Sequence, residues 1–585
     1  MITLGWGVLV AATGGINWTI GGIALRSRAP DRALALGFAL LAVYAFLFRE
    51  TLEHELSRAA ALLRRRIPAA AVSLAIGLGL YGVYFGSFTA GGSDSYGYVS
   101  QAYSWLHGTL PRAEPVPIRL PWPSGDASLA PLGYTLGPDP HTIVPIYAPG
   151  LPLMMAASLA VGRCGPYLVV PLCAALMVWL TFVLGRRAEG PWTGLVAALL
   201  AATSPIVLMQ SAVPMRDLPT ATLMTAAACA ALNSRRRDVL WCGLLTASAM
   251  IVRPHLPVVP LVLLLHVAFS SPKRERLIRV VLFITPVAAA AAAIAVLNTL
   301  WHGSPDNSGF GSAGELFNLS NVVPNLARYP AWLWRSQSPL VMLAILPLIP
   351  RFNRDGSRPA VRLCAALFLA TSASYLVYSP FEEWWYLRFL LPGLAPLFVL
   401  VAMALVVLAR RIPRPWGVLA AAAVVTLATA SALRFTRETA PPAALKMVER
   451  RYVDVGDYIH GALPANAVVL TVQQSGSVRF YGGRLTIRWD LIDRDWSGRA
   501  AAELERLGLH PYLVIEDFEL PLFRNWSGLA PETPLPWPLV ARMPENGGVS
   551  VLDLSATAQR ATPVVIRPGG APLCLGPAPF AFARR

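Results

Sequence analysis

Residues 386–408 read YLRFLLPGLAPLFVLVAMALVVL, and Arg388 is the only charged side chain among them. About 20 predominantly apolar residues suffice for an α-helix to cross a lipid bilayer. We therefore expect this stretch to form a membrane-spanning helix. It decides the class of fold in which the rest of the chain has to be placed.

Similar apolar runs recur along most of the chain. They lie at residues 2–24, 32–48, 68–89, 165–184, 191–209, 218–233, 238–252, 255–270, 277–299, 331–350, 361–379 and 415–433. Together they predict a mainly α, polytopic membrane helix bundle of about 13 spans. The run at 148–162 is short and rich in proline and glycine, so we expect it to be re-entrant or interfacial. The N-terminus lacks a basic n-region and an A-x-A cleavage site, which predicts a retained helix.

Composition supports a membrane protein. Of the 585 residues 55% are hydrophobic and 14% are charged, and the mean hydropathy is +0.52. Soluble domains carry about 25% charged residues, so a single water-soluble globule is excluded. Disordered chains are poor in apolar residues, which excludes disorder as well. The net charge of +17 is expected to set membrane topology and not to bind nucleic acid.

Basic residues gather in alternate loops between the expected spans. They are Arg64–Arg66, Arg186–Arg187, Arg235–Arg237, Lys273–Arg276, Arg351 with Arg354, and Arg410–Arg411. Basic loops usually face the cytoplasm, which places the intervening loops and the tail on the outer side. The scarcity of lysine is typical of a GC-rich genome, so we expect a bacterial inner (cytoplasmic) membrane protein whose active site and C-terminal domain are extracytoplasmic.

The tail differs from the rest of the chain. Residues 467–472 and 512–515 have the pattern of short buried strands, and 497–507 that of a helix ending at Gly508. We therefore divide the chain into an N-terminal hairpin and cytoplasmic loop (1–67), a catalytic bundle (68–435) with a long outer loop (90–147), and a soluble α/β domain (440–585). The six cysteines lie mostly in apolar runs without CxxC spacing, which predicts buried hydrophobic side chains and neither disulfides nor a zinc site.

Polar residues at the outer ends of spans mark a candidate site, because ionisable groups near a membrane are costly. Gly91-Gly-Ser-Asp94-Ser-Tyr96 follows the third span. Asp94 is a candidate general base; an N-cap of the helix that follows is the equal alternative. Pro145-Ile-Tyr147-Ala-Pro-Gly150-Leu-Pro152 is either a rigid turn into the membrane or the floor of a cavity.

Further candidates come from later segments. Asp217 starts a span. Together with Asp94 and nearby histidines (His107, His141 or His255), it supplies oxygen and nitrogen donors for a divalent cation. The sequence leaves open whether magnesium or manganese is a cofactor. Arg253 and Arg388 suit a lipid phosphate, or alternatively snorkel to the headgroups. The remaining candidates for substrate contact are His255, Glu382, Glu383, Trp384, Trp385 and Tyr386, and the three aromatic residues also fit a simple interfacial belt. The glycine-rich segment 303–314 is either a flap over the site or a linker.

In order along residues 68–408, these segments resemble the GT-C superfamily of membrane glycosyltransferases. The resemblance rests on Ser93-Asp94-Ser95-Tyr96, Tyr147-Ala-Pro-Gly-Leu-Pro152, Ser204-Pro205, Asp217-Leu-Pro219, Arg253-Pro254 and Tyr386-Leu-Arg388-Phe-Leu-Leu-Pro392. The branch it is most similar to contains protein O-mannosyltransferases and the aminoarabinose transferase of lipid A. Many relatives have an acidic pair in the first loop, whereas serines flank Asp94 here.

The resemblance implies a sugar donor on a polyprenyl phosphate and a hydroxyl acceptor on a lipid, a glycan or a protein. Asp94 is then the catalytic base of an inverting transfer, Arg253 and Arg388 hold the donor phosphate, and Asp217 orients an acceptor, a metal or an arginine. Tyr96, Tyr147, Trp384, Trp385 and Tyr386 are expected to contact substrate. An O-antigen ligase or polymerase, a polytopic lipid or glycan transporter, and a membrane scaffold remain the alternatives.

Overall fold

The computed structural model describes residues 2–20, 23–27, 29–113, 119–139, 141–233, 235–254, 256, 258–559, 562–569 and 574. The chain is mainly helical. The helices of more than four residues are α1 (Ile2–Thr13), α2 (Pro30–Leu47), α3 (Arg49–Phe85), α4 (Asp94–His107), α6 (Gly150–Ser158), α7 (Gly165–Ala188), α8 (Pro191–Thr203), α9 (Pro205–Ser211), α10 (Asp217–Ala231), α11 (Arg236–Val252), α12 (Val258–Ser270), α13 (Arg276–His302), α15 (Val322–Gln337), α16 (Arg358–Leu376), α17 (Leu391–Arg411), α18 (Trp416–Thr439), α19 (Pro442–Ala462), α21 (Ala500–Arg506) and α22 (Leu520–Ser527). The short helices α5 (Gly125–Ser128), α14 (Ala313–Leu316) and α20 (Ser475–Ser477) complete them.

Helix α17 lies at the centre of the bundle and packs against α7, α8, α10, α16 and α18. Together with the preceding 3₁₀ turn, Trp384–Leu390, it forms one long apolar segment. In the most apolar 18 residues of this segment, 89% are buried inside the protein. Small residues such as Gly393 and Ala395 let neighbouring helices approach closely, as is typical of helices packed inside a membrane. The apolar stretch 386–408, from which the membrane fold is predicted, therefore forms the central helix of the bundle. Arg388 lies in the turn just before this helix.

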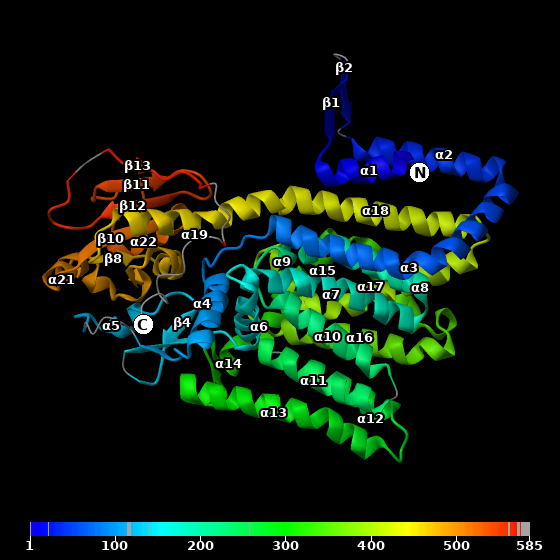
Figure 1. Cartoon of the computed structure of the whole chain (residues 1–585), viewed down its shortest axis with the longest axis horizontal. Helices are drawn as coiled ribbons and strands as arrows, with labels where there is room; N and C mark the ends of the chain where they lie inside the picture. Colours follow the sequence, from blue (N-terminus) through cyan, green and yellow to red (C-terminus); the bar gives the residue numbers. More distant parts are fainter. Residues whose placement is uncertain are drawn as a thin grey trace.

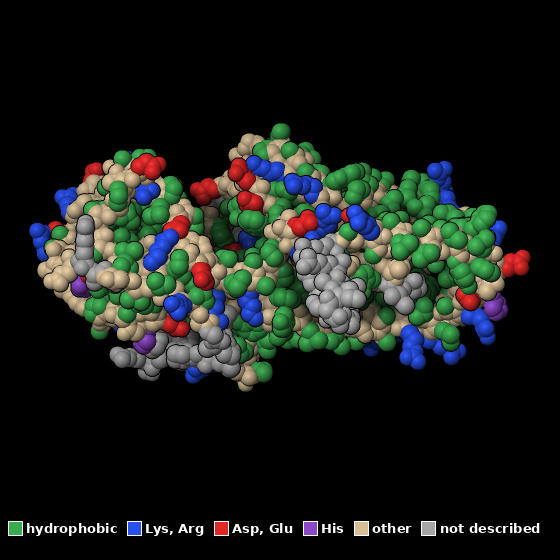
Figure 2. Space-filling view, turned by 90° about the horizontal axis from the view of Figure 1, so that it is seen from above, with side chains coloured by type: hydrophobic (Ala, Val, Ile, Leu, Met, Phe, Trp, Pro, Cys, Tyr) green, Lys and Arg blue, Asp and Glu red, His purple; other side chains and the backbone are tan. Residues whose placement is uncertain are grey.

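Seven helices of the described chain are long and apolar enough to cross a membrane, or eight if α8 and α9, bent by 61° at Ser204, form one span. The expected number of about 13 spans is not confirmed, because α10, α11 and α12 have 15, 17 and 13 residues. Figure 2 shows extended areas of hydrophobic side chains on the surface of the helical part. Among the exposed ones are Phe46, Tyr84, Phe269 and Leu277, side chains suited to lipid.

The N-terminal prediction is wrong in part. The run 2–24 does not form one helix: α1 ends at Thr13, and an antiparallel pair of strands follows, β1 (Ile16–Ile20) and β2 (Ile23–Ser27). Gly14 and Gly15 both have positive φ, which ends the helix, and a β-branched and aromatic segment follows them. The run 331–350 is also interrupted, because α15 ends at Gln337 and a 3₁₀ helix, Pro339–Leu348, continues the chain.

The basic loops meet at one end of the bundle, called here the basic end. Glu189, after α7, contacts Arg354 at 3.3 Å and Arg410 at 2.5 Å. Arg236 lies 3.2 Å from Glu275, which joins the loops that precede α11 and α13. Helices α13 and α18 both run from this end toward the C-terminal sheet (Figure 1). The opposite end, next to that sheet, is called the sheet end.

Residues after α18 build a separate layer at the sheet end, where α19 continues from α18 beyond the bundle (Figure 1). Its six-stranded sheet has the order β13-β11-β12-β10-β8-β9, with β8, β9 and β10 parallel and β12 antiparallel to β10. The strands are β8 (Ala467–Leu470), β9 (Leu485–Ile487), β10 (His510–Glu516), β11 (Leu539–Met543), β12 (Val549–Asp553) and β13 (Val564–Val565). Three short strands of the long loop, β3 (Arg112–Ala113), β4 (Tyr134–Leu136) and β5 (Thr142–Pro145), form a second sheet.

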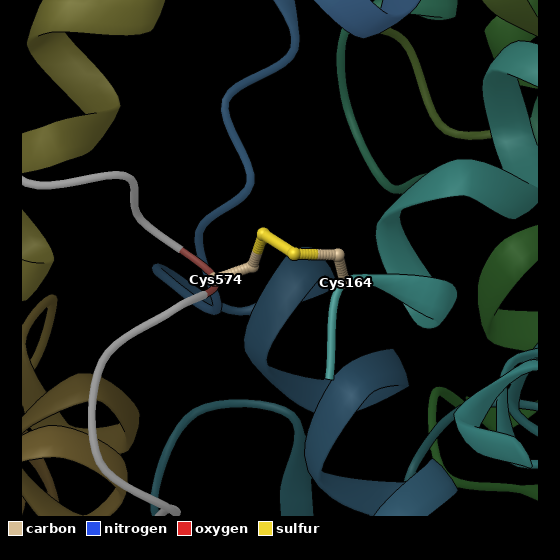
Figure 3. The surroundings of a disulfide bond; sticks show 2 residues. All are labelled: Cys164 and Cys574. Carbon is tan, nitrogen blue, oxygen red and sulfur yellow. A yellow bond between two sulfur atoms is a disulfide. The ribbon is translucent and has the colours of Figure 1, made fainter. Parts of the chain in front are cut away.

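The prediction that no cysteine forms a disulfide is wrong for one pair. Cys164, just before α7, is bonded to Cys574 near the C-terminus, 410 residues away (Figure 3). Cys173, Cys229, Cys242 and Cys364 are free and buried, as predicted. The spacing of two cysteines so far apart gives no indication that they meet. The bridge ties the C-terminal segment to the sheet end of the bundle.

Candidate active site

Asp94 faces Arg388 across the sheet end of the bundle. Arg388 Nη2 lies 3.4 Å from Asp94 Oδ2, and Nη1 of the same guanidinium lies 2.8 Å from Met215 Sδ. The Asp94 side chain is 31% exposed, so the carboxylate remains accessible to a second molecule. The guanidinium also lies 5.1 Å from the ring centre of Tyr386 and 5.5 Å from that of Phe389, a cation–π arrangement that holds it in place.

The local sequence explains why Asp94 points into the site. Gly92 adopts φ +56°, which ends the extended segment after α3, and Asp94 is the first residue of α4. Ser93 occupies the N-cap position and makes no capping hydrogen bond through its side chain. The Asp94 carboxylate is paired with Arg388, 294 residues away. Asp94 is not the N-cap of α4, because Ser93 occupies that position.

Asp217 and Arg253 form a second, buried pair. Arg253 Nη1 donates a hydrogen bond to Asp217 Oδ1, and both side chains are almost fully buried. Asp217 begins α10 and Arg253 follows the last residue of α11, so the pair joins the ends of two packed helices. The rings of Tyr375 and Phe389 lie 5.2 and 4.9 Å from the Arg253 guanidinium. A buried pair of this kind is costly to break, because one charge would remain without a partner.

The two pairs belong to one cluster. Arg388 lies within electrostatic reach of Asp94, Asp217 and Arg253, and Asp217 within reach of a third arginine, Arg216. Arg388 Nε, Arg253 Nε and Arg216 Nη1 are buried and find no hydrogen-bond acceptor among the described residues. Buried donors of this kind need a partner. The cluster therefore presents three guanidinium groups with unused donor capacity next to one accessible carboxylate.

Tyr147 connects the proline-rich turn with Asp94. Its hydroxyl lies 2.7 Å from Ser93 Oγ, and its ring packs against Tyr98 of α4 at 4.6 Å. Burial and the nearby Asp94 carboxylate raise the pKa of Tyr147 well above its usual value, so the phenol stays protonated and can donate. Gly150 packs so closely on the backbone of Val252 that a Cβ would come within 2.5 Å of the Val252 nitrogen. This close approach brings the turn next to Arg253.

The segment 303–314 covers the same region. It forms a small hairpin of β6 (Asn307–Ser308) and β7 (Gly311–Ser312), with Phe310 between the strands. The Phe310 ring lies 5.6 Å from Tyr147 and 5.5 Å from the Arg216 guanidinium. A cavity of about 110 Å³ lies between this hairpin, the proline-rich turn and α13. Its lining includes Tyr147, Pro254, Asn298, Trp301 and Asp306. Asp94, Asp217, Arg253 and Arg388 are not among the lining residues.

Several predicted site residues lie elsewhere. Tyr96 is buried against Gly476 and Phe480 of the C-terminal domain, which leaves it no access to substrate. Glu382 is 88% exposed and pairs with Arg328, and Glu383 is also exposed. Trp384 packs against Phe435 of α18, and Trp385 is partly buried against the bundle core. Tyr386 alone of these three aromatic residues contacts Arg388. His255 lies outside the described residues.

The donor set does not fit a divalent cation well. Asp94 and Asp217 each face a guanidinium group, and the described residues contain no cluster of three or more His, Cys, Asp or Glu able to hold a metal. His107 contacts the carbonyl of Tyr103, and His141 lies 3.7 Å from Asp126. The positive charge opposite the two carboxylates is therefore supplied by arginine in this arrangement.

Three neighbours of the cluster were not predicted. Arg216 precedes Asp217 in the sequence. Its place beside a predicted site residue at the end of an expected span is the feature that could have indicated it. Tyr98 lies one turn after Asp94 on α4 and is fully buried within reach of Arg216 and Asp94. Phe389 lies under both Arg253 and Arg388, and the apolar run that contains it hides its role.

Comparison with known proteins finds a family model that matches part of the helical bundle. Residues 147–301 match the family model described as dolichyl-phosphate-mannose-protein mannosyltransferase. No curated protein sequence matches the chain. The matched segment holds the proline-rich turn, Asp217 and Arg253.

Solved structures extend the likeness to most of the chain. ArnT from Cupriavidus metallidurans in the apo state has a TM-score of 0.50 and 14% identity, covering 86% of this chain and 100% of that one. The same protein bound to undecaprenyl phosphate has a TM-score of 0.49 and 13% identity, with coverages of 84% and 99%. The apo oligosaccharyltransferase of Archaeoglobus fulgidus has a TM-score of 0.45 and 12% identity, with coverages of 83% and 75%. The chain therefore shares the fold of apo ArnT over most of its length, and its residues 147–301 are similar to the mannosyltransferase family model.

Proposed function

We propose that the protein transfers a sugar from a polyprenyl-phosphate donor to a hydroxyl group of a lipid, glycan or protein acceptor. The observation that carries the proposal is the accessible Asp94 carboxylate beside Arg388, next to buried guanidinium donors that have no acceptor of their own. A carboxylate suits a hydroxyl that has to lose a proton, and guanidinium groups suit a phosphate that gains charge as it leaves. The family description names a dolichyl-phosphate sugar as donor, which supports this class of substrate.

In the proposed reaction Asp94 is the general base. It accepts the proton of the acceptor hydroxyl while that oxygen bonds to the anomeric carbon of the sugar. The bond from the anomeric carbon to the phosphate oxygen breaks on the opposite face, so the configuration inverts and the polyprenyl phosphate departs with the electron pair. Tyr147, one contact away through Ser93, can donate a hydrogen bond near the reacting groups. The proposed donor carries a hexose or a pentose.

Arg388, Arg253 and Arg216 stabilise the departing phosphate in this proposal. Arg388 changes partner: its 3.4 Å contact with Asp94 gives way to the donor phosphate, which frees the carboxylate for the acceptor. Asp217 holds Arg253 in place and is not itself a base, because it is buried in the pair. Asp94 and Asp217 each face a guanidinium group, so this proposal assigns no step to a metal ion.

We place the protein in a bacterial inner membrane with the sheet end outside the cytoplasm. Two independent observations support this orientation. The basic loops gather at the opposite end, and such loops usually face the cytoplasm. The Cys164–Cys574 disulfide lies at the sheet end, and disulfides persist in oxidising compartments. A lipid-linked donor then reaches Asp94 from within the bilayer.

The decisive experiment measures sugar transfer by the purified full-length protein from a panel of radiolabelled polyprenyl-phosphate sugars. Asp94→Asn should lower kcat by ~100- to 10,000-fold, the usual contribution of a general base. Asp126→Asn is the matched control, because Asp126 also lies in the outer loop but has its only ion pair among the described residues with His141. If Asp94→Asn transfers sugar as fast as Asp126→Asn, Asp94 is not the base. If the wild-type protein uses none of the donors, the proposed donor class is wrong.

A further inference from the structure

The C-terminal domain contacts the two glycines that precede Asp94. Tyr452 of α19 lies against Gly91, where an added Cβ would come within 2.0 Å of the tyrosine ring. At Gly92 an added Cβ would stand 3.3 Å from the Tyr452 hydroxyl and 3.2 Å from Gln473 Nε2. Gly91 leaves no space for a side chain, and Gly92 has the positive φ that favours glycine. The turn and the domain are thus in direct contact.

Tyr452 is itself held by a buried polar network. Its hydroxyl lies 2.6 Å from Gln473 Nε2 and 2.9 Å from Arg451 Nη2, both of which donate to it. Arg451 Nε in turn lies 3.0 and 3.1 Å from the two carboxylate oxygens of Glu516, at the end of β10. Gln474 Nε2 donates to the same carboxylate at 2.7 Å. A satisfied buried network of this kind fixes the orientation of its members.

The same domain holds the residues on either side of the glycines. The backbone nitrogen of Ala90 donates to the Tyr481 hydroxyl at 2.8 Å. Gly476 lies against the ring of Tyr96, where an added Cβ would come within 2.2 Å. The Gly91 carbonyl accepts the Tyr96 backbone N–H at 3.2 Å, which joins the clamped turn to the first turn of α4. Asp94 lies between these fixed points.

We infer that Tyr452 is a positioning residue for Asp94, so that the C-terminal domain sets the direction of the carboxylate toward Arg388. The inference rests on the proposed role of Asp94 as general base. A base works only within hydrogen-bond reach of the proton it accepts, and a displacement of about 1 Å can cost ~100-fold in rate. The hydroxyl of Tyr452 fixes the ring, and the ring fixes the glycine turn.

Tyr452→Phe in the full-length protein tests this, because it removes the hydroxyl and keeps the ring. We expect kcat to fall on the order of 10-fold while the KM for the donor stays unchanged, since the arginines are untouched. Hydrogen exchange of the backbone in residues 90–97 should become faster, whereas exchange in α17 should not change. Tyr458→Phe is the matched control: Tyr458 lies on the same helix, packs against the sheet core and makes no side-chain hydrogen bond to any described residue. It should behave as wild type in both measurements.

A double variant separates positioning from general weakening. If Tyr452 acts through Asp94, then Tyr452→Phe should have no further effect on transfer in the Asp94→Asn protein. The same fold loss in both backgrounds would overturn the inference, and so would a Tyr452→Phe protein identical to Tyr458→Phe in rate and exchange. If Asp94→Asn is fully active, the proposed base fails. The exchange rates of 90–97 then still decide whether Tyr452 holds the turn.

Discussion

Arg388 Nη2 lies 3.4 Å from Asp94 Oδ2, which is longer than the 2.7–2.9 Å typical of a charge-assisted hydrogen bond. The contact is therefore loose, although the guanidinium is firmly held by Met215 and two aromatic rings. A loose contact between a fixed arginine and an accessible carboxylate suits a site in which a third group enters. In the proposed reaction this group is the donor phosphate.

Arg388→Lys tests whether the shape of the guanidinium matters. Lysine keeps the charge but loses the planar set of donors that binds a phosphate through two parallel hydrogen bonds. We expect kcat/KM for the donor to fall by about 10-fold, and Arg388→Ala to lower it by ~100-fold or more, as for a lost oxyanion donor. Donor-dependent initial rates measure both effects.

Arg328→Lys is the control for this prediction. Arg328 also lies at the sheet end, but its partner is the exposed Glu382, 3.5 Å away. Exposed ion pairs contribute little, so this variant should match the wild type. An Arg388→Lys protein with the donor kinetics of Arg328→Lys would remove Arg388 from phosphate binding.

Asp217→Asn should destabilise the helical bundle. It leaves Arg253 buried without a charged partner, which costs about 3–5 kcal/mol in comparable buried pairs. The double variant Asp217→Leu/Arg253→Met should unfold at a higher temperature than Asp217→Asn, because it removes the buried Arg253 charge together with its partner. Thermal unfolding in detergent, followed by circular dichroism, gives the order of the three proteins.

The ion pair that the partly exposed Glu275 forms with Arg279 gives the reference for that experiment. Arg279 Nη2 lies 2.8 Å from Glu275 Oε2 at the basic end, and Glu275→Gln should cost much less stability than Asp217→Asn, because Glu275 is accessible to water. A loss of stability in Asp217→Asn as small as that of Glu275→Gln would show that the buried pair does not hold α10 to α11.

The sequence predicts the arrangement of this site better than its details. Each charged residue of the cluster lies at the outer end of an expected span, and the alternation of basic loops places these ends on the same side of the membrane. That reasoning brings Asp94, Asp217, Arg253 and Arg388 into one candidate site. It cannot tell which carboxylate pairs with which guanidinium, because the pairing depends on helix rotation and not on position along the chain.

Other residues were misplaced because their partners are distant in the sequence. Tyr96 follows Asp94 closely, yet its ring packs on Gly476, 380 residues later in the chain, as its contact shows. The disulfide joins Cys164 to Cys574 over 410 residues. The hydrophobicity of residues 2–24 predicts one span, but Gly14 and Gly15 adopt positive φ and end the helix at Thr13. Hydrophobicity alone does not predict the antiparallel strands β1 and β2 that follow α1.

Chelation should leave transfer unchanged if arginine supplies the positive charge. The two site carboxylates face guanidinium groups, and no third ligand joins them among the described residues. We expect equal rates in EDTA and in magnesium or manganese, measured with the best donor of the panel. A rate that disappears with EDTA and returns with one of these cations would show that a metal completes the site.

Stability of the C-terminal domain should fall as the pH rises. Burial raises the pKa of Glu519 from 4.5 to about 7, although the backbone N–H groups of Glu516 and Gln473 donate to its carboxylate. Between these values the folded state holds a proton that the unfolded state has lost. Stability is therefore full below pH 4.5 and decreases until about pH 7. At 1.36 kcal/mol per pKa unit, the total decrease is about 3 kcal/mol.

Glu519→Gln should remove this dependence, because the amide does not titrate. The measurement is thermal unfolding of the C-terminal domain between pH 5 and 8, followed by tryptophan fluorescence. The matched control is Glu503→Gln: Glu503 lies in the same domain on α21 and pairs with the exposed Arg506. An unchanged slope in Glu519→Gln would assign the pH dependence to another carboxylate.

The disulfide gives a test of orientation that does not depend on activity. If the sheet end faces an oxidising compartment, a membrane-impermeant maleimide added to intact cells should label the protein only after an impermeant reductant has opened the Cys164–Cys574 bond. The four other cysteines are buried in the bundle and should not react. Two labels per chain are expected in the wild type, one in Cys574→Ser without reductant, and none in the Cys164→Ser/Cys574→Ser double variant. If the maleimide reacts only after the cells have been permeabilised, the assignment is reversed. Asp94 and the sheet would then lie on the cytoplasmic side, away from the compartment that maintains the bond.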